Sequence, residues 1–134
     1  MRLIFIRHAE PDYALDSLTE AGFREAELLA KRAARWQVTG FFVSPLGRAR
    51  ATAAPTLAAA GRTAQTLDWL REFSCGEYQM PDRENKRKKV PWDFLPEYWT
   101  ARPEFADRDR WTQLPVMQAM PENVDDRFAE GRAG

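Results

Sequence analysis

The stretch that decides the fold of this chain is LIFIRHAE, residues 3–10. Its four consecutive apolar residues predict a strand that is buried on both faces, as strands of parallel sheets are. In open α/β sheets, ligands bind just beyond the carboxyl ends of the strands. Arg7 and His8 occupy that position, and His8 is the only histidine in the sequence. Any histidine chemistry of this chain must therefore begin at His8.

Strand and helix patterns alternate after this stretch. Small apolar residues at helical spacing predict a helix over residues 20–36, and short apolar runs predict strands at residues 41–43 and 64–67. The order strand–helix–strand–helix–strand over residues 1–72 implies a mostly parallel sheet with right-handed crossovers. We therefore expect an α/β fold.

The second helix is predicted from its boundary residues. Ser44 can cap it with Pro45 at the first helical position, and Gly61 is the expected C-terminal stop. Pro55 lies inside this helix, where a proline typically costs about 3 kcal/mol and bends the chain. We expect a kink or a break at Pro55.

The amino-acid composition changes beyond residue 76. Residues 77–121 combine many prolines with many aromatic residues, which predicts an ordered, cap-like insertion with short helices rather than a disordered linker. Residues 83–89 form a basic run that is expected to be a solvated face, and the residues from 122 onward predict the start of a helix. The length of 134 residues favours one domain over residues 1–134.

The composition argues against several classes of protein. Lys+Arg and Asp+Glu both number 20, so the net charge favours neither a nucleic-acid nor a membrane partner. The single cysteine, Cys75, excludes an intrachain disulfide, and one His with one Cys argues against a transition-metal site. The sequence shows no signal peptide and no apolar run of about 20 residues. We therefore expect a cytoplasmic protein.

Charged groups follow each of the three predicted strands. Arg7 and His8 end the first, Arg48 opens the helix after the second, and Glu72 follows the third. The carboxyl ends of parallel strands lie at one edge of a sheet, so these groups can converge. Two arginines and a helix N-terminus can bind a dianion such as phosphate. With a histidine as nucleophile and a carboxyl group as acid, this pattern indicates phosphoryl chemistry without a metal.

These segments resemble four motifs of the histidine phosphatase superfamily, which includes cofactor-dependent phosphoglycerate mutases and many phosphatases. RHAE at residues 7–10 resembles its Arg-His-Gly-Glu motif, and LTEAG at residues 18–22 resembles the motif that opens its first helix. SPLGRARATA at residues 44–53 is similar to its second-arginine motif, and LRE at residues 70–72, with Gly76, to its acidic-loop motif. The resemblance implies a phosphoglycerate mutase-like, three-layer α/β/α fold.

The resemblance also implies a role for each candidate catalytic residue. His8 would attack phosphorus in line and become a phosphohistidine. Arg7 and Arg48 would hold the phosphoryl oxygens and neutralise charge in the transition state. Glu72 would protonate the leaving group and then activate water. No metal and no cofactor is implied.

Glu10 and Trp92 are further candidates for substrate binding. The alternative to substrate binding by Glu10 is a structural role, in which it forms bonds within its own loop. Trp92 lies in a region, residues 92–96, that looks like the cap of a phosphatase branch of the family. For the aromatic residues between 92 and 111, the alternative is the core of the cap. The basic run at residues 83–89 could also attract an anionic substrate.

The chain departs from the family pattern at two places. Ala9 stands where the family usually has glycine, which is a small change. The family also has a second histidine on a later, central strand, which completes the phosphate pocket, and this sequence has no second histidine. We therefore expect a truncated chain, with a sheet that is incomplete at the C-terminus, exposed apolar surface and little or no phosphatase activity.

Three functions are compatible with these patterns. The first is a metal-independent phosphomonoesterase, a hydrolase that acts on a phosphorylated small molecule through a phosphohistidine. The second is a phosphoglycerate mutase, although residues 77–121 do not resemble the cap of the mutases. The third is a non-catalytic pseudo-enzyme that binds inorganic phosphate. The sequence leaves open the identity of the substrate and whether the chain forms a homodimer.

Overall fold

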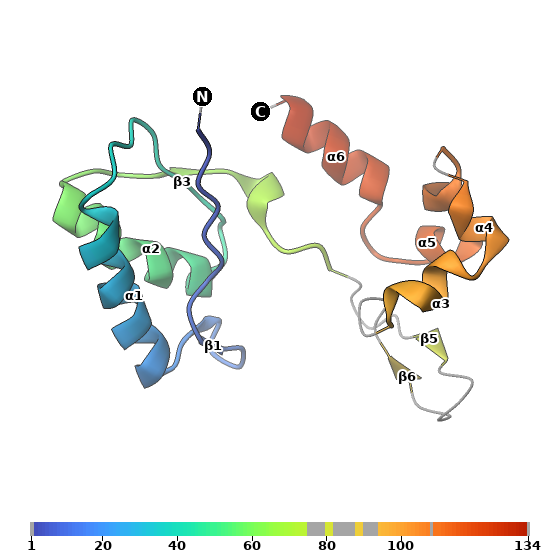
Figure 1. Cartoon of the computed structure of the whole chain (residues 1–134), viewed down its shortest axis with the longest axis horizontal. Helices are drawn as coiled ribbons and strands as arrows, with labels where there is room; N and C mark the ends of the chain where they lie inside the picture. Colours follow the sequence, from blue (N-terminus) through green and yellow to red (C-terminus); the bar gives the residue numbers. More distant parts are fainter. Residues whose placement is uncertain (1, 75–79, 82–87, 90–93, 108, 134) are drawn as a thin grey trace. The chain divides into compact units, whose positions relative to one another are not determined.

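The computed structural model (Figure 1) describes residues 2–74, 80–81, 88–89, 94–107 and 109–133. The chain divides into two compact units, Met1–Arg71 and Glu72–Gly134, and each unit is described by itself. None of the helices in the described ranges combines the length and the apolar content that a membrane span requires.

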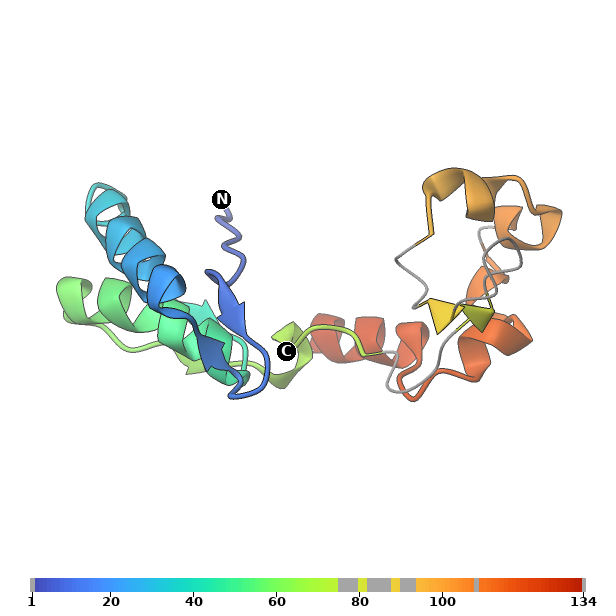
Figure 2. The same ribbon diagram turned by 90° about the horizontal axis from the view of Figure 1, so that it is seen from below.

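The first unit is built on two helices, α1 (Glu20–Ala33) and α2 (Gly47–Ala60), which lie side by side (Figure 1, Figure 2). α1 begins after Thr19, whose hydroxyl oxygen accepts a hydrogen bond of 3.1 Å from the Gly22 backbone N–H. Its inner face is rich in alanine, and Ala26 is completely buried. Small side chains at the contact allow two helices to approach closely. Both predicted helices are thus confirmed.

A short parallel sheet joins the strands on either side of α2. β3 (Phe42–Val43) and β4 (Gln65–Thr66) pair in parallel, with Phe42 opposite Gln65. The order strand, helix, parallel strand is the one predicted for this part of the chain. It places the first unit in the α/β class.

The loop before α1 forms an antiparallel hairpin that no sequence pattern predicts. β1 (Pro11–Asp12) pairs with β2 (Ser17–Leu18). The Asp12 carboxylate closes the turn by accepting the backbone N–H groups of Ala14 and Leu15 at 3.0 and 3.2 Å. Aspartate commonly stabilises turns in this way, by bonding backbone groups two or three residues ahead.

The apolar segment of residues 3–6 does not form the predicted buried strand. Its four side chains are exposed, and Phe5 retains 84% of its accessible surface. A segment becomes a strand only when a neighbouring segment offers backbone partners, and no strand among the described residues pairs with it. The prediction of a buried first strand is therefore wrong. The three-layer architecture and the mostly parallel sheet stay predictions.

α2 begins two residues later than predicted. The Ser44 hydroxyl oxygen accepts the Leu46 N–H at 3.3 Å, and the first helical residue is Gly47. The break expected at Pro55 is not found, because the helix continues through this residue from Gly47 to Ala60. It ends at Gly61 as predicted, with the glycine in the left-handed conformation at φ 60°.

The described part of the second unit consists mainly of short helices. Three of them begin with proline, whose missing N–H costs nothing at the first helical position. The predictions of short helices in this region and of a helix after residue 122 are confirmed. The elements are an antiparallel pair, β5 (Met80–Pro81) with β6 (Lys88–Lys89), and the helices α3 (Pro96–Thr100), α4 (Pro103–Ala106), η3 (Trp111–Gln113), α5 (Pro115–Gln118) and α6 (Val124–Ala133).

Aromatic rings pack against one another in this second unit. The ring of Phe94 lies 4.1 Å from that of Tyr98, and the ring of Trp99 lies 5.1 Å from Tyr98 and 4.9 Å from Phe105, measured between centroids. Edge-to-face and tilted pairs at these distances stabilise a small core. These contacts agree with a structural role for the aromatic residues of this region.

Gly22→Ala is expected to destabilise the first unit, although alanine is the better helix former by about 1 kcal/mol. A Cβ at Gly22 would clash with the carbonyl oxygen of Glu10. That carbonyl already accepts the Thr19 N–H at 3.1 Å, so it cannot move freely. We expect the free energy of unfolding to fall by about 1–3 kcal/mol in urea denaturation. Gly40→Ala, beside the movable ring of Phe42, is the control with a smaller effect, and a more stable Gly22 variant would contradict the argument.

Candidate active site

His8 is fixed by the backbone beside it. Its Nδ1 lies 2.8 Å from the carbonyl oxygen of Ala9. A carbonyl oxygen can only accept, so Nδ1 carries the proton in this bond and Nε2 of the neutral ring holds a lone pair. The side chain is half-buried, and the ring of Tyr13 stands edge-on to it with 6.3 Å between centroids. This tautomer and orientation suit a nucleophilic Nε2.

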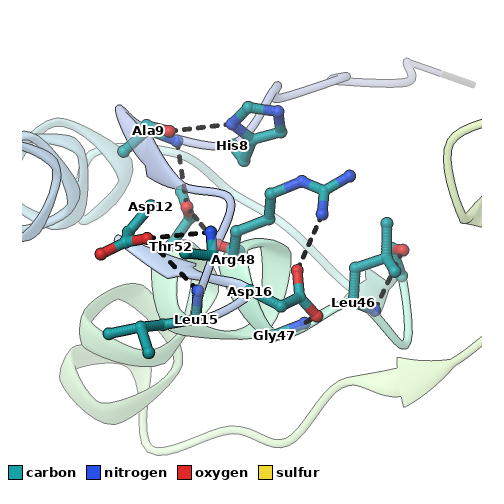
Figure 3. A network of polar contacts seen from close by, with 11 residues as sticks. His8, Ala9, Asp12, Leu15, Asp16, Leu46, Gly47, Arg48 and Thr52 are labelled. Atoms are coloured by element: carbon teal, nitrogen blue, oxygen red, sulfur yellow. Dashed lines mark hydrogen bonds and ion pairs between the residues drawn. The ribbon is translucent and has the colours of Figure 1, made fainter. Parts of the chain in front are cut away.

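Thr52 of α2 ties the His8 loop to the second helix. Its buried hydroxyl oxygen accepts the Ala9 N–H at 3.0 Å, and the hydroxyl donates to the Arg48 carbonyl at 2.8 Å (Figure 3). A single side chain thus connects the residue after His8 to the first turn of α2. The relative position of His8 and Arg48 is therefore set by specific bonds within one unit.

Thr52→Val is expected to loosen this connection. Valine keeps the shape of threonine but leaves the Ala9 N–H without its acceptor, which should lower the free energy of unfolding by about 1–3 kcal/mol. The measurement is urea denaturation together with hydrogen exchange of the Ala9 amide. Thr56→Val is the matched control on the same helix, because the buried Thr56 hydroxyl has no hydrogen-bond partner among the described residues. Equal effects of the two variants would contradict the role of Thr52.

Arg48 lies in the first turn of α2 and is held by Asp16 from the hairpin (Figure 3). Its Nη1 lies 2.7 Å from Asp16 Oδ1, and Asp16 Oδ2 accepts the Gly47 N–H at 2.6 Å. The carboxylate thereby caps α2 from a distance, which explains why the helix begins at Gly47. The guanidinium also lies over the Tyr13 ring, 5.3 Å from its centroid. The same aromatic ring therefore contacts both His8 and Arg48.

The electrostatics of this contact favour an ionised Asp16. The Gly47 N–H, at the positive end of the α2 dipole, and the Arg48 guanidinium hold the pKa of Asp16 below its ordinary value. A lowered pKa in the folded state means that this contact stabilises the fold above the unfolded-state pKa. The stabilisation is lost as the pH falls through the folded-state pKa. Asp16 therefore stays charged at neutral pH.

Two of the predicted site residues lie close to His8 in the sequence. Arg7 precedes it directly and is exposed. The Glu10 carboxylate accepts a hydrogen bond of 2.6 Å from the Thr19 hydroxyl, and the Glu10 N–H donates to the Glu25 carboxylate at 2.9 Å. Glu10 thus makes the contacts around its own loop that a structural role predicts. Its contact with substrate stays a prediction.

The remaining predicted site residues are not part of the first unit. Glu72 is exposed and is the first residue of the second unit, so its convergence with His8 and Arg48 stays a prediction. Trp92 lies outside the described residues, as does Cys75. Of the predicted catalytic residues, the described structure joins His8 and Arg48 through shared contacts.

Tyr13, Asp16 and Thr52 complete the cluster, and the sequence motifs did not single them out as site residues. For Thr52, a usable signal exists: it follows Arg48 by four residues, so it lies on the same face of the helix. For Asp16 there is none, because 32 residues separate it from Arg48 and local patterns do not report such pairs. Tyr13 is likewise placed by the hairpin rather than by a periodic pattern.

Comparison with known proteins places this geometry in a family. The sequence matches the profile of the histidine phosphatase superfamily (branch 1) over residues 3–130. No curated protein and no solved structure gives a significant match. The matched region contains His8, Arg48 and the hairpin that carries Asp16. Because the match spans nearly the entire sequence, the chain belongs to the histidine phosphatase superfamily.

Proposed function

We propose that this protein is of the metal-independent phosphomonoesterase type, which hydrolyses a small-molecule phosphate ester through a phosphohistidine at His8. Because the sequence holds one histidine, we expect phosphoryl transfer to His8 with little steady-state turnover. Family membership supports phosphatase- or mutase-type phosphoryl transfer in general. The observation that carries the finer proposal is the contact of His8 and Arg48 with one Tyr13 ring, with the lone pair of His8 on Nε2. A nucleophile and a largely buried cation are the two parts that phosphoryl transfer needs first.

In the proposed first step, His8 Nε2 attacks phosphorus. The Nε2–P bond forms while the bond from phosphorus to the ester oxygen breaks, and Glu72 gives its proton to that oxygen. In the second step, Glu72 takes a proton from water, the water oxygen attacks phosphorus and the Nε2–P bond breaks. Inorganic phosphate leaves and His8 is restored. The role of Glu72 rests on the family resemblance.

Arg48 and Arg7 would hold the phosphoryl oxygens during both steps. Arginine suits this task because its planar guanidinium offers several donors in a fixed geometry and is always charged. The side chain of Arg48 is only 12% exposed. In such a site its charge is screened less than that of a surface arginine, so its effect on the transition state is larger.

The test is phosphoryl transfer to the full chain from radiolabelled acetyl phosphate, a small donor. We expect one label per chain that survives alkali and is lost in acid, as a phosphohistidine is. Steady-state release of p-nitrophenol from p-nitrophenyl phosphate should be low or absent, because the sequence holds only one histidine. An acid-stable label, or no label, would contradict the proposal, and so would turnover without a labelled intermediate.

Two further measurements separate the alternatives. Isomerisation of 3-phosphoglycerate without release of phosphate would favour a mutase. Calorimetric binding of phosphate together with a complete lack of labelling would favour a phosphate-binding protein without catalysis. The phosphatase proposal predicts neither result.

A further inference from the structure

The Asp16 carboxylate uses both of its oxygens on the first turn of α2. Oδ1 bonds Arg48 Nη1 at 2.7 Å and Oδ2 bonds the Gly47 N–H at 2.6 Å. The Asp16 side chain is 45% exposed, whereas that of Arg48 is 12% exposed. Asp16 also has φ 45°, in the left-handed region that residues other than glycine rarely adopt. The carboxylate that bonds the first turn of α2 therefore belongs to a residue with an uncommon backbone conformation.

We propose that Asp16 is the positioning residue of Arg48, which holds the guanidinium in the orientation that binds phosphoryl oxygens. This inference rests on the proposed function, in which Arg48 binds the phosphoryl group. A guanidinium is planar, so a bond at Nη1 fixes the direction of its other N–H donors. The Tyr13 ring, 5.3 Å from the guanidinium carbon, restricts rotation out of that plane. Without these contacts, the substrate itself would have to order a long side chain.

The packing of the hairpin supports a fixed carboxylate rather than a mobile one. A Cβ at Gly47 would clash with the backbone carbonyl oxygen of Asp16, so the two backbones lie in close contact. The turn before Asp16 is closed by the bonds from Asp12 to Ala14 and Leu15. A carboxylate held at both oxygens on such a turn is not free to swing away when substrate arrives.

Charge alone predicts that Asp16 weakens anion binding, whereas positioning of Arg48 predicts that Asp16 strengthens it. A carboxylate beside Arg48 cancels part of the positive charge and should weaken the attraction for phosphate. If Asp16 acted only as a counter-ion, its neutralisation would tighten anion binding. If it acts by positioning Arg48, its neutralisation weakens anion binding. The sign of the change therefore tests the inference.

The experiment compares orthovanadate binding by the full-length wild type, Asp16→Asn and Glu27→Gln in isothermal titration calorimetry. Asparagine keeps the size of aspartate and tolerates the left-handed conformation, so the hairpin can form. Glu27 is exposed on α1, and its change to glutamine removes the same charge away from the site. We expect Asp16→Asn to bind vanadate about 10-fold more weakly because preorganisation is lost. Glu27→Gln should bind as the wild type does, and equal or tighter binding by Asp16→Asn would overturn the inference.

Asp16→Glu adds a second test that does not depend on charge. Glutamate keeps the negative charge but moves the carboxylate by one methylene. Positioning predicts weaker vanadate binding for this variant as well, whereas a counter-ion effect predicts no change in vanadate affinity. Thermal unfolding followed by circular dichroism establishes that each variant is folded. Wild-type affinity in a folded Asp16→Glu variant would count against positioning.

Nitrogen NMR of the Arg48 guanidinium separates this inference from the proposed function. The signals are assigned by their loss in Arg48→Lys. We expect slow rotation and resolved Nη signals in the wild type, and merged signals in Asp16→Asn. If the wild type binds no vanadate, the proposed function fails while the NMR comparison still tests the positioning. Identical Arg48 signals in the wild type and Asp16→Asn would overturn it.

Discussion

His8→Asn is expected to abolish transfer of the labelled phosphoryl group, with the rate falling by about 10⁴-fold or more. The side-chain amide of asparagine lies where Nδ1 of histidine lies, so it can still donate to the Ala9 carbonyl, which His8 contacts at 2.8 Å. The variant therefore removes Nε2 while it keeps the anchoring bond of the loop. The measurement is labelling by radiolabelled acetyl phosphate, followed by acid treatment.

The control for this variant is binding of inorganic phosphate in isothermal titration calorimetry. In the proposed site the arginines hold the phosphate oxygens, so His8→Asn should retain most of the wild-type phosphate affinity while labelling disappears. Thermal unfolding should be close to that of the wild type, because the bond to Ala9 is kept. Undiminished labelling of this variant would show that the nucleophile is not His8.

The parts of the fold that local chemistry determines could be predicted from the sequence. α1 follows from helical spacing and α2 from its boundary residues, and Gly61 ends α2 because glycine adopts the left-handed conformation without steric cost. The parallel pairing of β3 with β4 follows from the strand–helix–strand order, because a helical crossover joins parallel strands. His8 and Arg48 could be identified as candidate site residues because each lies in a motif of the family, and Arg48 also lies in the first turn of a predicted helix.

The parts that depend on distant residues could not be predicted. The segment of residues 3–6 is apolar enough for a buried strand, but apolar character does not supply a backbone partner, and its side chains are exposed. The local capping pattern of Ser44 and Pro45 predicts a start of α2 that is two residues too early. The helix begins after Leu46, and the N–H of its first residue, Gly47, is bonded by the Asp16 carboxylate across 31 residues of sequence. A prediction from a local pattern finds a capping residue that is near in the sequence. It does not find a distant residue that folding brings to the start of the helix.

Arg48→Lys is expected to reduce phosphoryl transfer by about 10²-fold, the effect of removing one preorganised donor from a phosphoryl site. Lysine keeps the charge but replaces a planar group with several donors by a single ammonium. It cannot keep the 2.7 Å bond to Asp16 and the contact with the Tyr13 ring in the same geometry. Vanadate affinity should fall together with the labelling rate, since both depend on the phosphoryl oxygens.

Arg50→Lys is the matched control, because Arg50 is an exposed arginine on the same helix. It should leave labelling and vanadate affinity unchanged. If Arg48→Lys behaved like Arg50→Lys, Arg48 would be a structural residue that serves only to bind Asp16. If Arg48→Lys lost labelling but kept its affinity for inorganic phosphate, a ground-state ligand, Arg48 would act in the transition state alone. The combined loss is expected because a guanidinium held in place before substrate arrives acts on the bound phosphoryl group and on its transition state alike.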